Sequence, residues 1–228
     1  MAGSVIFEEQ IEIPDIGSLS DFRQWALSDR FPDRGRIDYI EGRIEVDMSP
    51  EDLFVHGAVK TEIVRVLSEI VKRENLGYLF TDSSRITAPD ADLSAEPDVI
   101  FVSSDALDSQ RVKLIAKASG EQGRYVEMEG GADLVVEIVS DSSVSKDTRR
   151  LPQAYFNAGT TEFWLIDARK DQLLFQIHGR GAAGFESTSV DKDGFQRSSV
   201  LRRAFQLERR HDDRGFFMFD LRSTSADA

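Results

Sequence analysis

The sequence predicts an α/β protein whose last part consists of antiparallel strands. Apolar residues recur with helical spacing along residues 55–71, which indicates one long amphipathic helix. Two apolar runs, residues 98–102 and 134–139, have the length and the β-branched content of buried strands. After residue 180, apolar and polar residues alternate between glycines as in a few antiparallel strands, and a frayed tail is expected from Ser223.

The composition predicts one globular domain over residues 1–228. Hydrophobic residues make up 40% and charged residues 30% of the chain, which fits neither a disordered protein nor a fibrous repeat. The chain has no cysteine, so disulfides, thiolate metal sites and cysteine nucleophiles are excluded. No apolar run approaches the ~20 residues of a membrane span, and the N-terminus lacks the features of a signal peptide. We therefore expect a cytoplasmic location and no membrane partner.

The net charge opposes non-specific binding to nucleic acid. The 28 basic and 41 acidic residues leave a formal charge of −13, which repels phosphate backbones unless basic groups gather on one face. The arginine-rich segment 197–214 is a candidate for such a face. A DNA partner therefore requires a local basic surface of this kind.

The first expected elements are a strand, a short helix and a hairpin. A strand-like stretch covers residues 5–13, and Ser18 or Ser20 can cap the amphipathic helix that follows. Strand-like residues 37–46 surround a Glu-Gly pair at 41–42, where glycine supplies the tight turn of a β-hairpin.

The long helix begins and ends with recognisable signals. Residues 49–52 provide a cap, a proline and first-turn acids, and the apolar stripe stops near Asn75 and Gly77. Short strands are expected next, at residues 78–80 and 85–87.

The second half of the chain returns to strands after a polar interval. Residues 105–131 are expected to form a surface excursion with room for one helix. A helix over residues 142–158 is closed by Gly159, at the position that favours a C-terminal cap. Strands are predicted to follow at residues 161–167 and 172–177.

Two acids in the apolar strands are the main candidates for chemistry. Glu137 interrupts an otherwise apolar strand, and Asp98 opens the other one. A buried carboxylate without a partner is costly, so such an acid needs a cation or strong donors beside it. If the two strands are neighbours, both carboxylates can emerge at one end of the sheet, ~4–6 Å apart, and hold a Mg²⁺ or Mn²⁺ ion.

Each of these acids also has a purely structural interpretation. Asp98 follows Pro97 and can simply be the residue that starts a strand. Glu137 can form an ion pair with Arg149 or Arg150 on the helix that follows its strand.

A series of short motifs occurs in order along residues 20–180. They are Glu41-Gly42, Met48-Ser49-Pro50, His56-Gly57, Pro97-Asp98-Val99, Asp133 with Glu137 and Ser140, Asp147 with Tyr155 eight residues later, Ala158-Gly159, and the run from Glu162 to Asp167. In this order and spacing they resemble the Uma-type family of putative restriction endonucleases. That family is placed in the PD-(D/E)XK nuclease superfamily.

The resemblance implies both a fold and an activity. The implied fold is a restriction-endonuclease-like mixed sheet flanked by helices, with a core at about residues 20–180 and a C-terminal β elaboration at about 181–222. The implied activity is that of a Mg²⁺- or Mn²⁺-dependent endonuclease that hydrolyses DNA phosphodiester bonds, with Asp98 and Glu137 as catalytic metal ligands. A lysine that assists the attacking water or the scissile phosphate completes the superfamily pattern.

In the superfamily pattern the lysine lies two residues after the Glu, a position held here by Val139, and relatives that place it instead midway between the residues matching Asp147 and Tyr155 have it at the position of Leu151. Lys146 lies near the start of the helix that follows the strand of Glu137, and its long side chain can fold back over the strand end. It is the first candidate for the catalytic lysine, and Arg149, three positions further on the same helical face, is the second. An amine is preferred because burial can lower its pKa, whereas a guanidinium stays charged.

Three further residues are weaker candidates. His56 could orient an acid or a water, although a lone histidine near a helix start is more often a surface or capping residue. Asp38 or Glu41 could supply a third acid, with a solvated hairpin as the alternative. The three histidines of the chain lack ligand spacing, so no zinc is expected, and the absence of nucleotide-binding motifs predicts no nucleotide cofactor.

Two functional hypotheses follow from the sequence. The first is a metal-dependent DNA endonuclease that uses Asp98, Glu137 and Lys146. The second is a non-catalytic protein that keeps the nuclease fold and serves as an oligomeric or binding module. A homodimer is the expected assembly.

Overall fold

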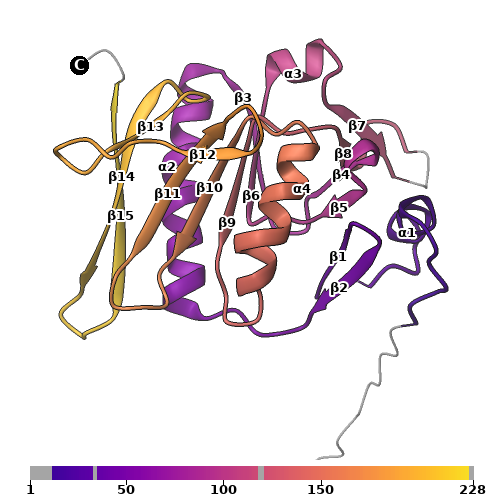
Figure 1. Cartoon of the computed structure of the whole chain (residues 1–228), viewed down its shortest axis with the longest axis horizontal. Coiled ribbons are helices and arrows are strands. Elements are labelled where there is room, and N and C mark those ends of the chain that lie inside the picture. The colour runs from indigo at the N-terminus through magenta and orange to yellow at the C-terminus, as the bar shows by residue number, and fades with distance from the viewer. Residues whose placement is uncertain (1–11, 33–34, 118–120, 226–228) are drawn as a thin grey trace, which may run out of the picture.

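The structure is a computed structural model that describes residues 12–32, 35–117 and 121–225 (Figure 1). Its helical elements are α1 (Leu19–Ala26), η1 (Leu53–Gly57), α2 (Ala58–Glu74), η2 (Pro89–Ala91), α3 (Ser104–Asp108), η3 (Lys146–Arg150) and α4 (Leu151–Asn157). Its strands are β1 (Arg36–Ile40), β2 (Arg43–Asp47), β3 (Gly77–Thr81), β4 (Arg85–Ala88), β5 (Leu93–Ala95), β6 (Val99–Ser103), β7 (Lys113–Ala116), β8 (Tyr125–Glu129), β9 (Leu134–Ile138), β10 (Glu162–Asp167), β11 (Leu174–Arg180), β12 (Phe185–Ser187), β13 (Gln196–Ser198), β14 (Arg203–His211) and β15 (Phe217–Ser225). The predicted α/β class is confirmed.

These strands form three sheets. The central sheet has the order β12-β11-β10-β9-β6-β3 and is mixed, because β9 and β10 run parallel while the other neighbours are antiparallel. The hairpin sheet, in the order β2-β1-β5-β4-β8-β7, has one parallel pair, β4 and β8. The C-terminal sheet consists of antiparallel β13, β14 and β15.

The central sheet is covered on both faces. Along β6, Val99 and Phe101 pack toward α2 and the C-terminal sheet, whereas Ile100 and Val102 pack toward α4 and the hairpin sheet. Figure 1 shows α2 and α4 on opposite sides of this sheet. Burial on both faces explains why its inner strands are nearly continuous apolar runs in the sequence.

The β1–β2 hairpin presents different side chains to its two faces. Ile37 and Tyr39 pack against the aromatic residues of α1, and the alternation of a strand sends Arg36 and Asp38 to the opposite face. The turn at residues 41–42 has positive φ at both positions, 49° and 78°, as the predicted tight turn requires. The hairpin therefore delivers a row of charged side chains to the end of the central sheet.

The two longer helices start differently from the prediction. Asp52, and not Ser49, caps the long helix, since its carboxylate accepts the N–H groups of Phe54 and Val55, each at 2.8 Å. The π-helical segments η1 and η3 lie in the first turns of both helices, and the helix predicted over residues 142–158 begins at Val144. A π-helical turn is not visible in the hydrophobic spacing from which the helices were predicted.

Two other expectations are corrected and one lies outside the described residues. Residues 105–131 are more than a surface excursion, because β8 runs parallel beside β4 inside the hairpin sheet. The C-terminus is not frayed from Ser223, because β15 pairs with β14 as far as Ser225. Most of the strand predicted at residues 5–13 falls among residues 1–11, which are not described.

Glu162 connects the C-terminal sheet to the central sheet. This carboxylate at the start of β10 is fully buried and accepts hydrogen bonds from Trp164 Nε1 (2.8 Å), Ser198 Oγ (2.6 Å) and the Ser199 N–H (2.8 Å). The hydrogen bonds satisfy the buried carboxylate and hold the turn after β13 against β10. Glu162 is thus a polar link between the two sheets, in addition to the apolar packing of the C-terminal sheet against the core.

We predict that Glu162→Ala lowers the free energy of unfolding by ~2–4 kcal/mol, because it leaves several buried donors without an acceptor. Urea unfolding followed by tryptophan fluorescence measures the change. The control is Glu186→Ala, an exposed acid on neighbouring β12, for which we expect a change below ~0.5 kcal/mol. Equal effects of the two substitutions would contradict the structural role of Glu162.

Candidate active site

Asp98 and Glu137 lie side by side at one end of the central sheet. Strands β6 and β9 are antiparallel neighbours in which Val99 pairs with Val136, so extending this register by one residue puts Asp98 across from Glu137. Both side chains are fully buried, and both belong to the face that packs toward α4 and the hairpin sheet. The predicted adjacency of the two strands is confirmed.

One arginine contacts both carboxylates. Arg36, the first residue of β1, places Nη2 at 2.7 Å from Asp98 Oδ1 and Nη1 at 3.9 Å from Glu137 Oε2. Its side chain is 20% exposed, whereas the two acids are inaccessible. The guanidinium therefore lies between the paired acids and the solvent.

Asp98 has partners on every side. In addition to Arg36, its carboxylate accepts the Ile138 N–H at 2.7 Å and lies 3.5 Å from both His56 Nε2 and Lys60 Nζ. Burial alone would raise the pKa of Asp98, but the contact with His56 and the charges of Arg36 and Lys60 lower it well below its ordinary value. Asp98 is therefore a permanent anion.

Glu137 is in the opposite electrostatic situation. Tyr155 donates its hydroxyl to Oε1 at 2.6 Å, and Oε2 accepts no hydrogen bond. Burial raises the pKa of Glu137 well above its ordinary value, and the charges of Asp147 and Asp98 raise it further. The paired acids thus have pKa values shifted in opposite directions.

Asp147 adds a third buried carboxylate to the site. It accepts a hydrogen bond from Ser143 Oγ through Oδ2, and its Oδ1 has no hydrogen-bond partner. Burial raises the pKa of Asp147 to about 6, although Lys146 and Ser143 oppose the shift.

Lys146 enters the site from η3 and is buried. Its Nζ lies 2.9 Å from Asp38 Oδ2, and Asp38 in turn accepts the Glu96 N–H through Oδ1 at 2.9 Å. Burial would lower the pKa of Lys146, but the charges of Asp38 and Glu137 raise it above its ordinary value. The lowering that burial allows does not occur here, because the charges of Asp38 and Glu137 outweigh the effect of burial.

The remaining predicted residues are divided between the site and the surface. His56 is buried beside Asp98, whereas Glu41 is exposed in the hairpin turn, at the opposite end of β1 from Arg36. Arg149 is exposed on η3. The predicted ion pair between Glu137 and Arg149 or Arg150 does not form: Arg150 pairs with Glu45, and Arg36 is the cation near Glu137.

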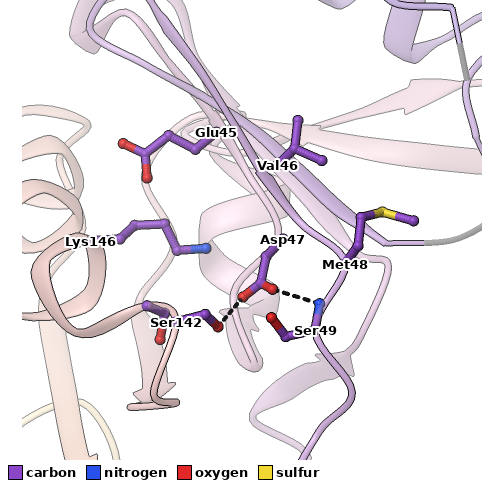
Figure 2. A pocket seen from close by; sticks show the side chains of 8 residues that line it. Glu45, Val46, Asp47, Met48, Ser49, Ser142 and Lys146 are labelled. Atoms are coloured by element: carbon purple, nitrogen blue, oxygen red, sulfur yellow. Dashed lines mark hydrogen bonds between the residues drawn. The ribbon is translucent and has the colours of Figure 1, made fainter.

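The site opens to solvent through a groove of about 550 Å³. Arg36 and His56 line the groove, together with acids of which Asp47 and Glu96 are two. A second pocket of about 380 Å³ is lined by Lys146 and shares Asp47 with the groove. Figure 2 shows Asp47 accepting hydrogen bonds there from the Ser142 hydroxyl at 2.8 Å and the Ser49 N–H at 2.9 Å.

Sequence reasoning did not select Arg36 or Lys60. Arg36 precedes Asp38 by two residues on one strand, so both had to share a face, and Lys60 follows His56 by one helical turn. These spacings were visible, but which acids the two cations would contact depends on pairing between distant segments.

Three of the six arginines in segment 197–214 are engaged within the fold. Arg203 pairs with Glu74, Arg210 pairs with Asp220, and Arg209 donates to main-chain oxygens of the turn between β10 and β11. These contacts reduce the free positive charge that the segment can offer to a polyanion.

Comparison with known proteins decides the family. The model of the Uma2 family, described as putative restriction endonuclease, matches residues 19–210. The chain belongs to this family. The resemblance inferred from the motifs is thus confirmed, and membership of the Uma2 family supports a nuclease as the function class.

A solved structure is similar in fold. The crystal structure of a putative nuclease belonging to DUF820 from Anabaena variabilis aligns with a TM-score of 0.59 at 20% sequence identity, covering 81% of this chain and 90% of that chain. No curated protein matches the chain. Within the described residues, no helix has the length and apolar character needed to cross a membrane.

We predict that, in EDTA at pH 7, Glu137→Gln is as stable as the wild type or more stable. Because folding raises the pKa of Glu137, its ionisation costs stability as the pH rises above the unfolded-state value, ~4.3. Glutamine removes this cost and keeps an acceptor for Tyr155. The advantage of the variant should shrink as the pH falls toward ~4.

Urea unfolding of both proteins between pH 4 and pH 8 measures this dependence. Glu186→Gln, at an exposed position, controls for a general effect of charge. A large loss of stability in Glu137→Gln at pH 7 would mean that the ionised carboxylate is a structural partner of Arg36.

Proposed function

We propose that this member of the Uma2 family is a divalent-metal-dependent nuclease that hydrolyses phosphodiester bonds in DNA. The observation that carries the proposal is the pair of buried carboxylates, Asp98 and Glu137, at the end of adjacent strands beside a groove open to solvent. Buried acids at a concave site, with pKa values shifted in opposite directions, are typical of a functional centre.

The residues present fit a hard divalent cation. Carboxylate oxygens are the ligands that Mg²⁺ and Mn²⁺ prefer, and Glu137 Oε2 is a buried oxygen without a hydrogen-bond partner. Asp98 and Glu137 would hold the ion, and a bound ion supplies polarisation of a phosphoryl oxygen and activation of water. His56, Asp98 and Glu51 also offer ligand atoms within 4.8 Å of one another.

Lys146 would stabilise phosphate charge and would not act as a base. The charges of Asp38 and Glu137 keep the pKa of its amine raised, so the amine stays protonated. It lines the pocket next to the groove, where an incoming phosphate would meet a fixed ammonium. Preorganised charge of this kind is a large contribution to catalysis of phosphoryl transfer.

The polar neighbours of the acids would position them. Tyr155 holds one oxygen of Glu137 and so directs the other away from the ring. The Ile138 N–H holds Asp98 Oδ2, which leaves Oδ1 toward Arg36. Both acids would thus be orientated before a substrate arrives.

A specific observation favours the non-catalytic alternative. The acids of the site are already compensated by cations of the chain itself, with Arg36 and Lys60 at Asp98 and Lys146 at Asp38. The expected lysine is missing both at the superfamily position, held by Val139, and at the alternative position of relatives, held by Leu151, and both residues are buried and apolar. Such a site can also serve as a structural centre of a binding module, and a homodimer stays a prediction.

Cleavage of DNA tests the two functions. We expect the wild type to cut plasmid, linear duplex or single-stranded DNA with Mn²⁺ or Mg²⁺, and Asp98→Asn to lose at least ~100-fold in rate. We also expect Lys146→Ala to lose ~100-fold, because it removes the fixed ammonium. Arg149→Ala is the matched control, since Arg149 is an exposed cation on the same turn, and its rate should equal that of the wild type.

Rates are compared at equal concentrations of folded protein, because Lys146→Ala leaves Asp38 without its cation. Full activity of Lys146→Ala would exclude Lys146 from the reaction. If the wild type cuts none of these substrates with either metal, the non-catalytic alternative replaces the nuclease.

A further inference from the structure

This inference rests on the proposed metal site and concerns Arg36. The guanidinium uses two different nitrogens to contact Asp98 and Glu137, at 2.7 and 3.9 Å. No other cation among the described residues forms ion pairs with both of these acids. Arg36 therefore occupies the position where a cation held jointly by the two carboxylates would lie.

We propose that Arg36 is a built-in counter-ion of the Asp98–Glu137 pair, and that its guanidinium moves into the groove when the two carboxylates bind a divalent cation. The pair would then always have a positive partner, either the chain's own arginine or the ion. Binding of the ion would be weakened by the cost of removing the arginine.

The groove offers Arg36 a place to move to. Its side chain already lines the groove and is 20% exposed, so the movement needs no rearrangement of the core. Acids line the same groove, and one of them, Asp47, lies opposite Arg36 in the register of the hairpin. A displaced guanidinium would therefore find a carboxylate without leaving the site.

Both acids keep other partners when the guanidinium leaves. Asp98 keeps the Ile138 N–H, and His56 and Lys60 stay near its carboxylate. Glu137 keeps the hydroxyl of Tyr155, and its contact with Arg36 is longer than a hydrogen bond.

Lys60 does not have the same role. Its Nζ lies 2.7 Å from both Glu51 and Asp82, and it is further from Asp98, at 3.5 Å. Among the described residues, Lys60 makes no ion pair with Glu137. Lys60 therefore contacts Asp98 but not the second acid of the pair, which makes it the matched control for the loss of one positive charge.

The test is the affinity for Mn²⁺ in the absence of DNA, measured by calorimetric titration of the full chain. We expect Arg36→Gln to bind Mn²⁺ about tenfold more tightly than the wild type, since a charge-assisted contact no longer has to be broken. Lys60→Gln should increase the affinity for Mn²⁺ clearly less. The increase in affinity caused by Arg36→Gln should vanish when it is combined with Glu137→Gln.

Each outcome has a defined meaning. Weak binding of Mn²⁺ by the wild type, together with tighter binding by Arg36→Gln, supports displacement. Equal or weaker binding by Arg36→Gln, or an equal gain in Lys60→Gln, overturns it. If Arg36→Gln does not fold, Arg36→Lys serves instead, because lysine offers a single nitrogen where Arg36 uses two to contact Asp98 and Glu137, and this variant should also bind Mn²⁺ more tightly than the wild type. Failure to cut DNA leaves these affinities unaffected, so a failure of the nuclease proposal is distinguishable from a failure of this one.

Discussion

Compensation of buried negative charge is the constraint on which this structure depends. Asp38, Asp98, Glu137 and Asp147 are each at most 1% exposed, and they gather where the central sheet meets the hairpin. Carboxylates removed from water are tolerated only with cations, donors or protons beside them. Arg36, Lys60 and Lys146 supply the cations, Tyr155 and main-chain N–H groups supply donors, and burial raises the pKa values of Glu137 and Asp147.

The topology explains why the compensation takes this form. Antiparallel pairing of β6 with β9 brings the start of one strand beside the end of the other, so Asp98 and Glu137 had to meet. The hairpin approaches this end of the sheet with Arg36 and Asp38 on one face, while η3 brings Lys146. Three separate parts of the chain therefore contribute charged side chains to one site. The two π-helical turns, η1 and η3, lie next to this site, and such turns often occur at functional sites.

The sequence was sufficient for the parts of the site that depend on local pattern. An acid within an apolar strand identifies Glu137, the strand start identifies Asp98, and the helix after Glu137 identifies Lys146. The sequence was insufficient for contacts that depend on pairing between segments far apart in the chain. The partner of Glu137 was expected on the following helix and is Arg36, about a hundred residues earlier in the chain. β8 was missed for the same reason. The place of a polar strand in a sheet can be predicted only when its pairing partner, here β4, is known.

The central claim is that Asp98 and Glu137 form a cation site which Arg36 fills from within the chain. A crystal of the wild type soaked in Mn²⁺ tests it most directly, through anomalous scattering of the manganese. We expect an anomalous peak at ligand distance, roughly 2.2 Å, from oxygens of both carboxylates, with the Arg36 guanidinium moved toward the groove. A map with no manganese at these acids, and with Arg36 still between them at saturating Mn²⁺, would contradict it.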